Sequence, residues 1–133
     1  MKGQVVILDQ DKKLILRKSN LIVDQAKTII AKLISGSDLS SNYVSKIALG
    51  TSDSLPDITD TSLGNEVARV LISNITFPSY DKVTFEGYVD NNTANGNTIK
   101  ELGLFTNGDS QNPNGLLFAR TTISPLTKDS TFS

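Results

Sequence analysis

The stretch Thr98-Ile99-Lys100-Glu101-Leu102-Gly103-Leu104-Phe105, with the segment Gly115-Leu116-Leu117-Phe118-Ala119-Arg120 that follows it, decides the fold. Both segments are apolar runs of the length of a β-strand, and the polar residues 106–114 between them predict a connecting loop. Each strand carries one charged residue next to or inside the core, Glu101 in the first and Arg120 in the second. We therefore expect two core strands with a charge in each.

Length and composition limit what the chain can be. With 133 residues and no internal repeat, we expect one domain over residues 1–133, with a hairpin and a helix in 1–36 and the remaining strands in 43–133. Cys and His are absent, which excludes a disulfide framework, thiol catalysis, a His-dependent triad and a His-liganded metal. The apolar run Val5–Leu8 is too short for a signal peptide or a membrane span, so we expect a soluble protein.

The charges are distributed unevenly along the chain. The net charge of −1 argues against nucleic acid as an obligate partner, because phosphate binding needs a basic surface. Residues 1–34 have seven Lys or Arg against three Asp, a net charge of +4, and the remainder has six against eleven, a net charge of −5. This asymmetry is either a chance distribution over a solvated surface or the basis of a head-to-tail contact between copies.

The N-terminal part predicts a hairpin followed by a helix. The apolar runs 4–9 and 13–18 flank the polar turn 9–12, as in a β-hairpin. Asp24 is placed as an N-cap, and Gly36 is placed to end a helix over 25–35. Its apolar residues recur at the spacing of one helical face, which indicates that this face covers the sheet: Ala26, Ile29, Ile30, Leu33 and Ile34.

Four further apolar segments predict strands at 43–49, 67–72, 75–77 and 82–90. In the last of these, Val83, Phe85 and Val89 alternate with Thr84 and Glu86, which is typical of a strand with one buried and one solvated face. We therefore expect a mainly β protein of the α+β type. The predicted architecture is an antiparallel β-sandwich of about seven to eight strands with one amphipathic helix.

The residue types and spacings give no catalytic or metal motif. Asp90, Asn92 and Glu101 fall at three ligand positions of a calcium loop, but Asn95 stands where that loop needs Gly, so we expect a polar hairpin loop over 91–97. Glu86 and Glu101 are not brought together by their spacing. We expect no enzyme activity, no cofactor and no metal site.

Several segments, in order, resemble a known family. They are Ile47-Ala48-Leu49-Gly50-Thr51, Asp60-Thr61-Ser62-Leu63-Gly64-Asn65-Glu66 leading to Arg69, Ala94-Asn95-Gly96, residues 98–105, Leu116-Leu117-Phe118-Ala119-Arg120 and Ser124-Pro125-Leu126-Thr127-Lys128. Together with Asn20-Leu21-Ile22-Val23, this pattern is similar to a family of tailed-bacteriophage structural proteins, described as tail fibre, tail tip or baseplate components. The similarity covers nearly the whole chain.

The resemblance implies a virion building block of β-sandwich type, made in the bacterial cytoplasm and incorporated in the tail, with no catalytic residues. Its expected partners are copies of itself in a trimer or ring, other tail or baseplate proteins, and a host surface receptor if it lies at the tail tip. A receptor- or glycan-binding module is the first alternative, and a cell-wall hydrolase is the second. The loops 52–62 and 106–114 are candidate contact surfaces. Their candidate interface residues are Asp53, Asp57, Asp60, Asn107, Asp109 and Asn112.

Four charged residues stand among apolar neighbours: Glu66, Arg69, Glu101 and Arg120. Each side chain either reaches the surface along its aliphatic stem or belongs to an ion pair across adjacent strands or a subunit boundary, with Glu101 and Arg120 the best candidates. Related sequences continue past residue 128 with another apolar strand, whereas this sequence has only residues 129–133 there. Either the closing strand is short, or another chain completes the sheet, or these residues are part of something longer. An open sheet edge left by a missing strand would be a place where a neighbouring subunit could add one.

Overall fold

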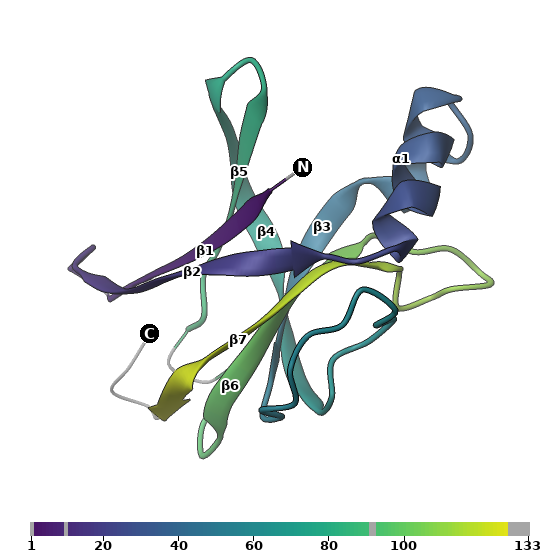
Figure 1. Cartoon of the computed structure of the whole chain (residues 1–133). Coiled ribbons are helices and arrows are strands. Elements are labelled where there is room, and N and C mark those ends of the chain that lie inside the picture. Colours follow the sequence, from purple (N-terminus) through teal and green to yellow (C-terminus); the bar gives the residue numbers. More distant parts are fainter. Residues whose placement is uncertain (1, 10, 91–92, 128–133) are drawn as a thin grey trace.

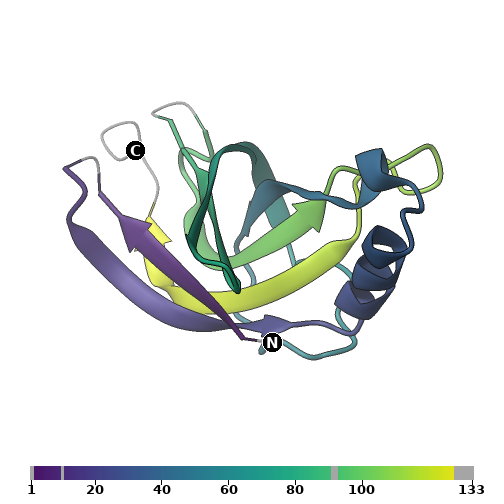
Figure 2. The same ribbon diagram turned by 90° about the horizontal axis from the view of Figure 1, so that it is seen from above.

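A computed structural model describes residues 2–9, 11–90 and 93–127. In order, the chain forms β1 (Gly3–Leu8), β2 (Leu14–Ile22), α1 (Gln25–Ile34), α2 (Leu39–Asn42), β3 (Val44–Gly50), β4 (Glu66–Ser79), β5 (Lys82–Gly87), β6 (Thr98–Thr106) and β7 (Leu117–Thr127). The seven strands make one antiparallel sheet in the order β1-β2-β7-β6-β3-β4-β5. Figures 1 and 2 show that this sheet curls into a half-barrel, with α1 at one end.

The expectation of a β-sandwich is wrong. A sandwich needs two sheets packed face to face, whereas all seven strands here belong to one hydrogen-bonded order. The curl of the sheet replaces a second sheet, because it places apolar side chains of β1 and β2 against the same core cluster as those of β4. That cluster is centred on Leu49, Ile99, Leu102 and Ile123, with Val5, Ile7 and Val70 among the residues packed against it. A mainly β chain with a short helix is confirmed.

The second core cluster lies on the opposite face of the sheet, where α1 and the loop 51–65 cover it. It contains Val23, Ala48, Leu63, Phe105 and Leu117. The alternation of β6 explains the division, since Leu102 and its neighbours Glu101 and Gly103 must point to opposite faces. The long loop therefore supplies a core residue, Leu63, and is part of the packed structure.

The helix α1 is confirmed almost to the residue, but its N-cap differs from the prediction. Asp24 makes no side-chain capping bond, and its carboxylate lies 3.7 Å from the Lys27 ammonium. At the other end Gly36 has φ +74, and the amides of Gly36 and Ser37 donate to the carbonyls of Leu33 and Lys32. These bonds satisfy the free carbonyls of the last helical turn, as expected for a glycine after a helix.

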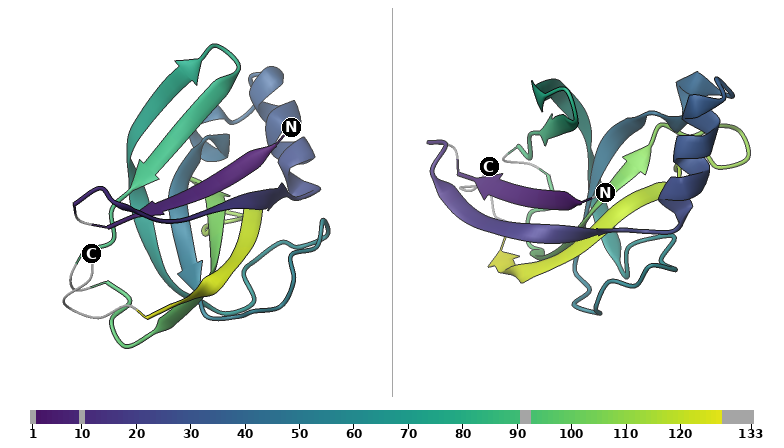
Figure 3. Two further views of the ribbon diagram at one scale, coloured as in Figure 1. Left: turned by 60° about the vertical axis from the view of Figure 1, so that its left-hand side comes forward. Right: turned by 45° about the horizontal axis from the view of Figure 1, so that its top comes forward.

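The strands β4 and β5 differ from the expected short segments. β4 is one continuous strand of 14 residues, with register shifts that mark bulges after Ile72 and after Thr76. Its first half pairs with β3 and its second half with β5. The second half and β5 therefore form a two-stranded ribbon that projects from the half-barrel (Figure 1; Figure 3, left).

The expected open edge beside the C-terminal segment falls partly on residues 128–133, which lie outside the described residues. Within the described part of the chain, β7 is a central strand that pairs with β6 along most of its length and with β2 through Leu21 and Ile22. The outer strands of the sheet are β1 and β5. Any strand addition to the described sheet would thus take place at those two edges.

Candidate functional site

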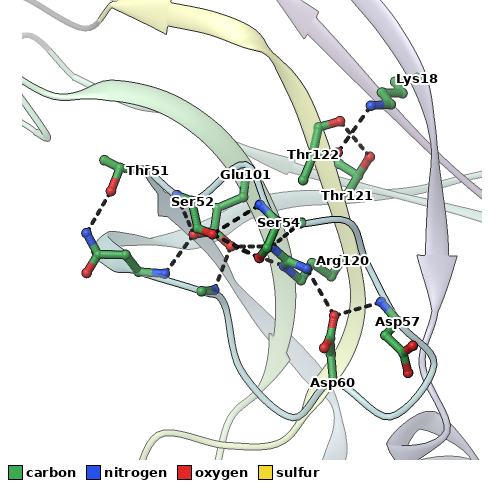
Figure 4. Close-up of polar contacts among 12 residues, drawn as sticks. Lys18, Thr51, Ser52, Ser54, Asp57, Asp60, Glu101, Arg120, Thr121 and Thr122 are labelled. Carbon is green, nitrogen blue, oxygen red and sulfur yellow. Dashed lines mark hydrogen bonds and ion pairs between the residues drawn. The ribbon is translucent and has the colours of Figure 1, made fainter.

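The carboxylate of Glu101 lies at the centre of a buried polar cluster. Glu101 is fully buried on β6, on the face of the sheet that the loop 51–65 covers. Its Oε2 accepts hydrogen bonds from the backbone amides of Ser52 at 2.9 Å and Asn65 at 2.8 Å, and its Oε1 accepts one from the amide of Gly64 at 2.8 Å. One side chain therefore holds both ends of the loop (Figure 4).

Arg120 of β7 completes the cluster. Its side chain is 2% exposed, and its Nε and Nη2 lie 3.1 and 3.0 Å from Glu101 Oε1. Its Nη1 lies 3.0 Å from Asp60 Oδ2, and its Nη2 also donates to the carbonyl oxygen of Ser54 at 2.9 Å. The guanidinium thus joins β7 to the middle of the loop, while Glu101 joins β6 to the ends of the loop.

Glycine at two positions makes room for this arrangement. A Cβ added to Gly50 would lie 2.5 Å from Glu101 Oε2 and 2.6 Å from the carbonyl oxygen of Asn65. A Cβ added to Gly103, which pairs with Arg120 across the ladder, would lie 2.8 Å from a methyl group of Leu63. The loop can approach the sheet this closely because neither position has a side chain.

The chemistry of the cluster is that of a structural clamp. The Glu101 carboxylate accepts from three backbone amides and a guanidinium, and all three nitrogens of the Arg120 guanidinium have acceptors. A pocket of about 380 Å³ opens beside them, lined by residues that include Ser54, Thr59 and Asp60. Because the charged groups are already paired with each other, the clamp fixes loop shape and strand register, and removal of one partner would leave a buried charge.

The loop side of the clamp is itself ordered by a turn. Asp60 Oδ2 accepts from the amide of Asp57 at 2.9 Å, in addition to Arg120. The amide and the hydroxyl of Thr59 donate to Asp57 Oδ1 at 2.9 and 2.7 Å. These two hydrogen bonds hold the pKa of Asp57 below its ordinary value of 3.8, and the bond from the Thr59 hydroxyl has the larger effect.

Glu66 and Arg69 form a second, separate cluster on β4. The guanidinium of Arg69 pairs with both carboxylate oxygens of Glu66 and donates to the carbonyl oxygen of Asn114. It also lies over the ring of Phe105, 3.9 Å from the centroid. This cluster ties β4 to the loop between β6 and β7, through a cation–π contact and an ion pair that are partly exposed.

The remaining interface candidates have different surroundings. Asp53 is exposed. Asn107 donates to the carbonyl oxygen of Ser40 at 3.0 Å and accepts from Ser45, so it joins its loop to α2 and β3. Asp109 accepts from the amides of Gln111 and Asn112, which makes it a turn former inside its own loop.

The contribution of the backbone to the clamp was not predicted. The sequence leaves two alternatives for Glu101 and Arg120, an ion pair or side chains that reach the surface. The structure shows the ion pair. The amides of Ser52, Gly64 and Asn65 carry no side-chain signal, and the loop has no periodicity that places it over β6. Asp60 was expected as a contact residue, and in the structure it is a partner of Arg120.

Comparisons with models of known protein families, with curated proteins and with solved structures gave no significant match. Over residues 2–9, 11–90 and 93–127, no group of three or more acidic side chains is placed to hold a metal ion. Neither helix in the described part of the chain is long and apolar enough to cross a membrane.

Proposed function

We propose that this chain is a structural protein of a tailed-bacteriophage virion, a component of the tail, baseplate or fibre, that works by assembling with copies of itself and docking other virion proteins. The resemblance of the segments at 47–51, 60–66, 98–105 and 116–128 to tail proteins supports the proposal. The observation that carries it is the projecting β4–β5 ribbon, whose apolar face is exposed.

The ribbon is amphipathic, as the register shows. Ile75 pairs with Phe85 across the two strands, and the next pair, Thr76 with Thr84, points to the opposite face. Alternation along β5 places Val83 on the same face as Phe85, and Phe77 lies at the bulge after Thr76. In the free chain Ile75, Phe77 and Val83 are 47%, 72% and 45% exposed.

Such a ribbon needs a partner surface. An isolated two-stranded ribbon is only marginally stable in water, because it buries too little apolar area to offset the conformational entropy of ordering its residues. Contiguous exposed apolar residues on a soluble protein are typical of a protein–protein contact. We therefore assign the ribbon to an assembly interface.

The clamp supports the same function. Because Glu101 and Arg120 hold the ends and the middle of the loop 51–65, this loop can present a fixed shape to a second virion protein at a low entropic cost of ordering. The loop 106–114 is tied down by Asn107 and by the contact of Arg69 with Asn114. We propose both loops as docking surfaces for other tail proteins.

The purified full chain tests this proposal. Mass photometry and sedimentation equilibrium should show a concentration-dependent oligomer built from 14.3 kDa units, and antibody labelling of purified virions should mark the tail. In parallel, the chain should bind neither bacterial cells nor cell-wall glycans and should not degrade them. A strict monomer that binds cells would replace the proposal by the receptor-binding alternative, and turnover of cell wall would replace it by the hydrolase.

A further inference from the structure

We propose that copies of this chain associate head to tail, with the apolar face of the β4–β5 ribbon of one copy packed on the outer face of the β1–β2 hairpin of the next. The inference rests on the proposed function, since it names the surfaces through which the assembly forms. Both are two-stranded extensions of the sheet at its opposite ends. They leave the half-barrel in different directions (Figure 1; Figure 3, right).

The outer face of the β1–β2 hairpin is apolar and exposed. In β1, exposed and half-buried residues alternate, so Val6 and Leu8 point away from the core. Leu14 lies opposite Leu8, and Ile15 is the extra residue of a bulge beside it. These four residues are between 37% and 51% exposed, which makes this face similar in apolar character to that of the ribbon.

The strand β1 has no charged residue and no proline to protect its edge. Edge strands of soluble proteins are usually blocked by an inward charge or a proline. The six residues of β1, Gly-Gln-Val-Val-Ile-Leu, include neither. Among the described residues, β1 pairs with β2 only, so its outer backbone groups are available to a neighbouring chain.

Charge identifies a second copy as the occupant. Residues 2–22, which include the hairpin, contain five Lys or Arg and two Asp, a net charge of +3. Residues 70–90, which include the ribbon, contain Lys82 against Asp81, Glu86 and Asp90, a net charge of −2. Arg17 lies opposite Val6 on the outer face of the hairpin, and Asp81 lies in the turn at the tip of the ribbon, so the two apolar faces have charges of opposite sign beside them. Glu86 lies opposite Asn74 on the other face of the ribbon.

The same charges disfavour contacts between like surfaces. A contact of hairpin with hairpin or of ribbon with ribbon across a two-fold axis would bring like charges together. A single contact of hairpin with ribbon brings opposite charges together and leaves an unused ribbon on one copy and an unused hairpin on the other. Such a heterologous contact repeats from copy to copy and closes into a ring when the rotation permits.

Charge reversal in the full-length chain tests the inference. The first variant carries Lys13→Glu and Arg17→Glu in the hairpin, the second carries Asp81→Lys in the turn of the ribbon, and the third carries all three changes. Each of the first two should raise the concentration at half-association by about three- to tenfold, because attraction between Asp81 and the basic residues of the hairpin becomes repulsion. The third should restore association to within a few-fold of the parent. Lys27→Glu with Lys32→Glu on α1 is the matched control and should change little.

Phe77→Ser provides a second readout that does not depend on charge. It should abolish the oligomer while leaving the circular dichroism spectrum unchanged, and Leu55→Ser, at an 84% exposed loop position, is its control. Association that persists in the first two variants and in Phe77→Ser would overturn the inference and leave the proposed function standing on another surface. A parent chain that stays monomeric at all concentrations would overturn self-assembly itself.

Discussion

Glu101 and Arg120 are diagonal neighbours in the β6–β7 ladder, and their side chains meet at 3.0 Å although neither is the backbone partner of the other. Thr122 lies opposite Glu101, and Gly103 lies opposite Arg120. The diagonal contact requires the register that is observed, because a slip of one residue would send one of the two side chains to the opposite face. The pair therefore couples strand register to the position of the loop 51–65.

Removal of one partner of the pair should destabilise the fold strongly. We expect Glu101→Gln to lower the free energy of unfolding by about 3 to 5 kcal/mol, because it leaves the buried Arg120 without its main counter-charge. Urea denaturation followed by circular dichroism measures the change. Asp60→Asn is the matched control, since its partly exposed carboxylate should contribute about 1 kcal/mol or less.

A double-mutant cycle separates the pair from its surroundings. Glu101→Gln and Arg120→Met together should cost less than the sum of the two single changes, with a coupling free energy of about 1 to 3 kcal/mol. The measurement is the free energy of unfolding of all four chains under the same conditions. Additive effects would mean that the two side chains do not interact.

The space above Gly50 should be essential for the clamp. We expect Gly50→Ala to destabilise the protein by about 1 to 3 kcal/mol, because the added Cβ would collide with the Glu101 carboxylate and the Asn65 carbonyl. Limited proteolysis should then cut within residues 51–65 faster than in the parent. Gly96→Ala is the control: it has no neighbour within 4 Å of the added Cβ, so it should bear only the strain of its positive φ and leave the loop protected. Equal rates of proteolysis in the parent and in Gly50→Ala would mean that the clamp does not need the space above Gly50.

The cluster around Arg69 should hold the loop between β6 and β7. Arg69→Lys should lose the forked contact with Glu66 and the stacking on Phe105, with an expected cost of about 0.5 to 1.5 kcal/mol. Amide hydrogen exchange should accelerate in residues 107–115 and stay unchanged in 51–65. Accelerated exchange in both loops would show that the two clusters are not independent.

The carboxyl group of Asp57 should titrate below its ordinary value of 3.8 because Thr59 donates two hydrogen bonds to it. A depressed pKa in the folded state favours folding above the ordinary pKa, and this contribution is lost as the pH falls through the folded value. NMR titration of the carboxyl carbon measures the shift. In Thr59→Val the hydroxyl is absent, so the pKa of Asp57 should rise toward 3.8. An unchanged pKa would assign the shift to another cause.

The elements that could be predicted are those with a local signal. The helix follows from apolar spacing and Gly36, and the strands β6 and β7 follow from their length and apolar composition. The half-barrel could not be predicted, because alternation shows which face of a strand is buried but not whether a second sheet or the curl of the same sheet covers it. A loop was predicted over residues 52–62, and the role of the loop 51–65 in binding Glu101 depends on backbone amides that no residue type reveals.

The position of β2 in the sheet has a consequence for synthesis of the protein on the ribosome. β2 leaves the ribosome about a hundred residues before its partner β7, and the two strands pair through Leu21 with Arg120 and Ile22 with Ala119. Pairing over such a separation is slow, because the intervening chain must first be brought together. Until β7 has been made, the edge of β2 that will pair with it is unprotected. If the proposed self-association occurs, a folded copy of the chain competes with β7 for this edge. Assembly could then begin before synthesis of the newer copy has finished.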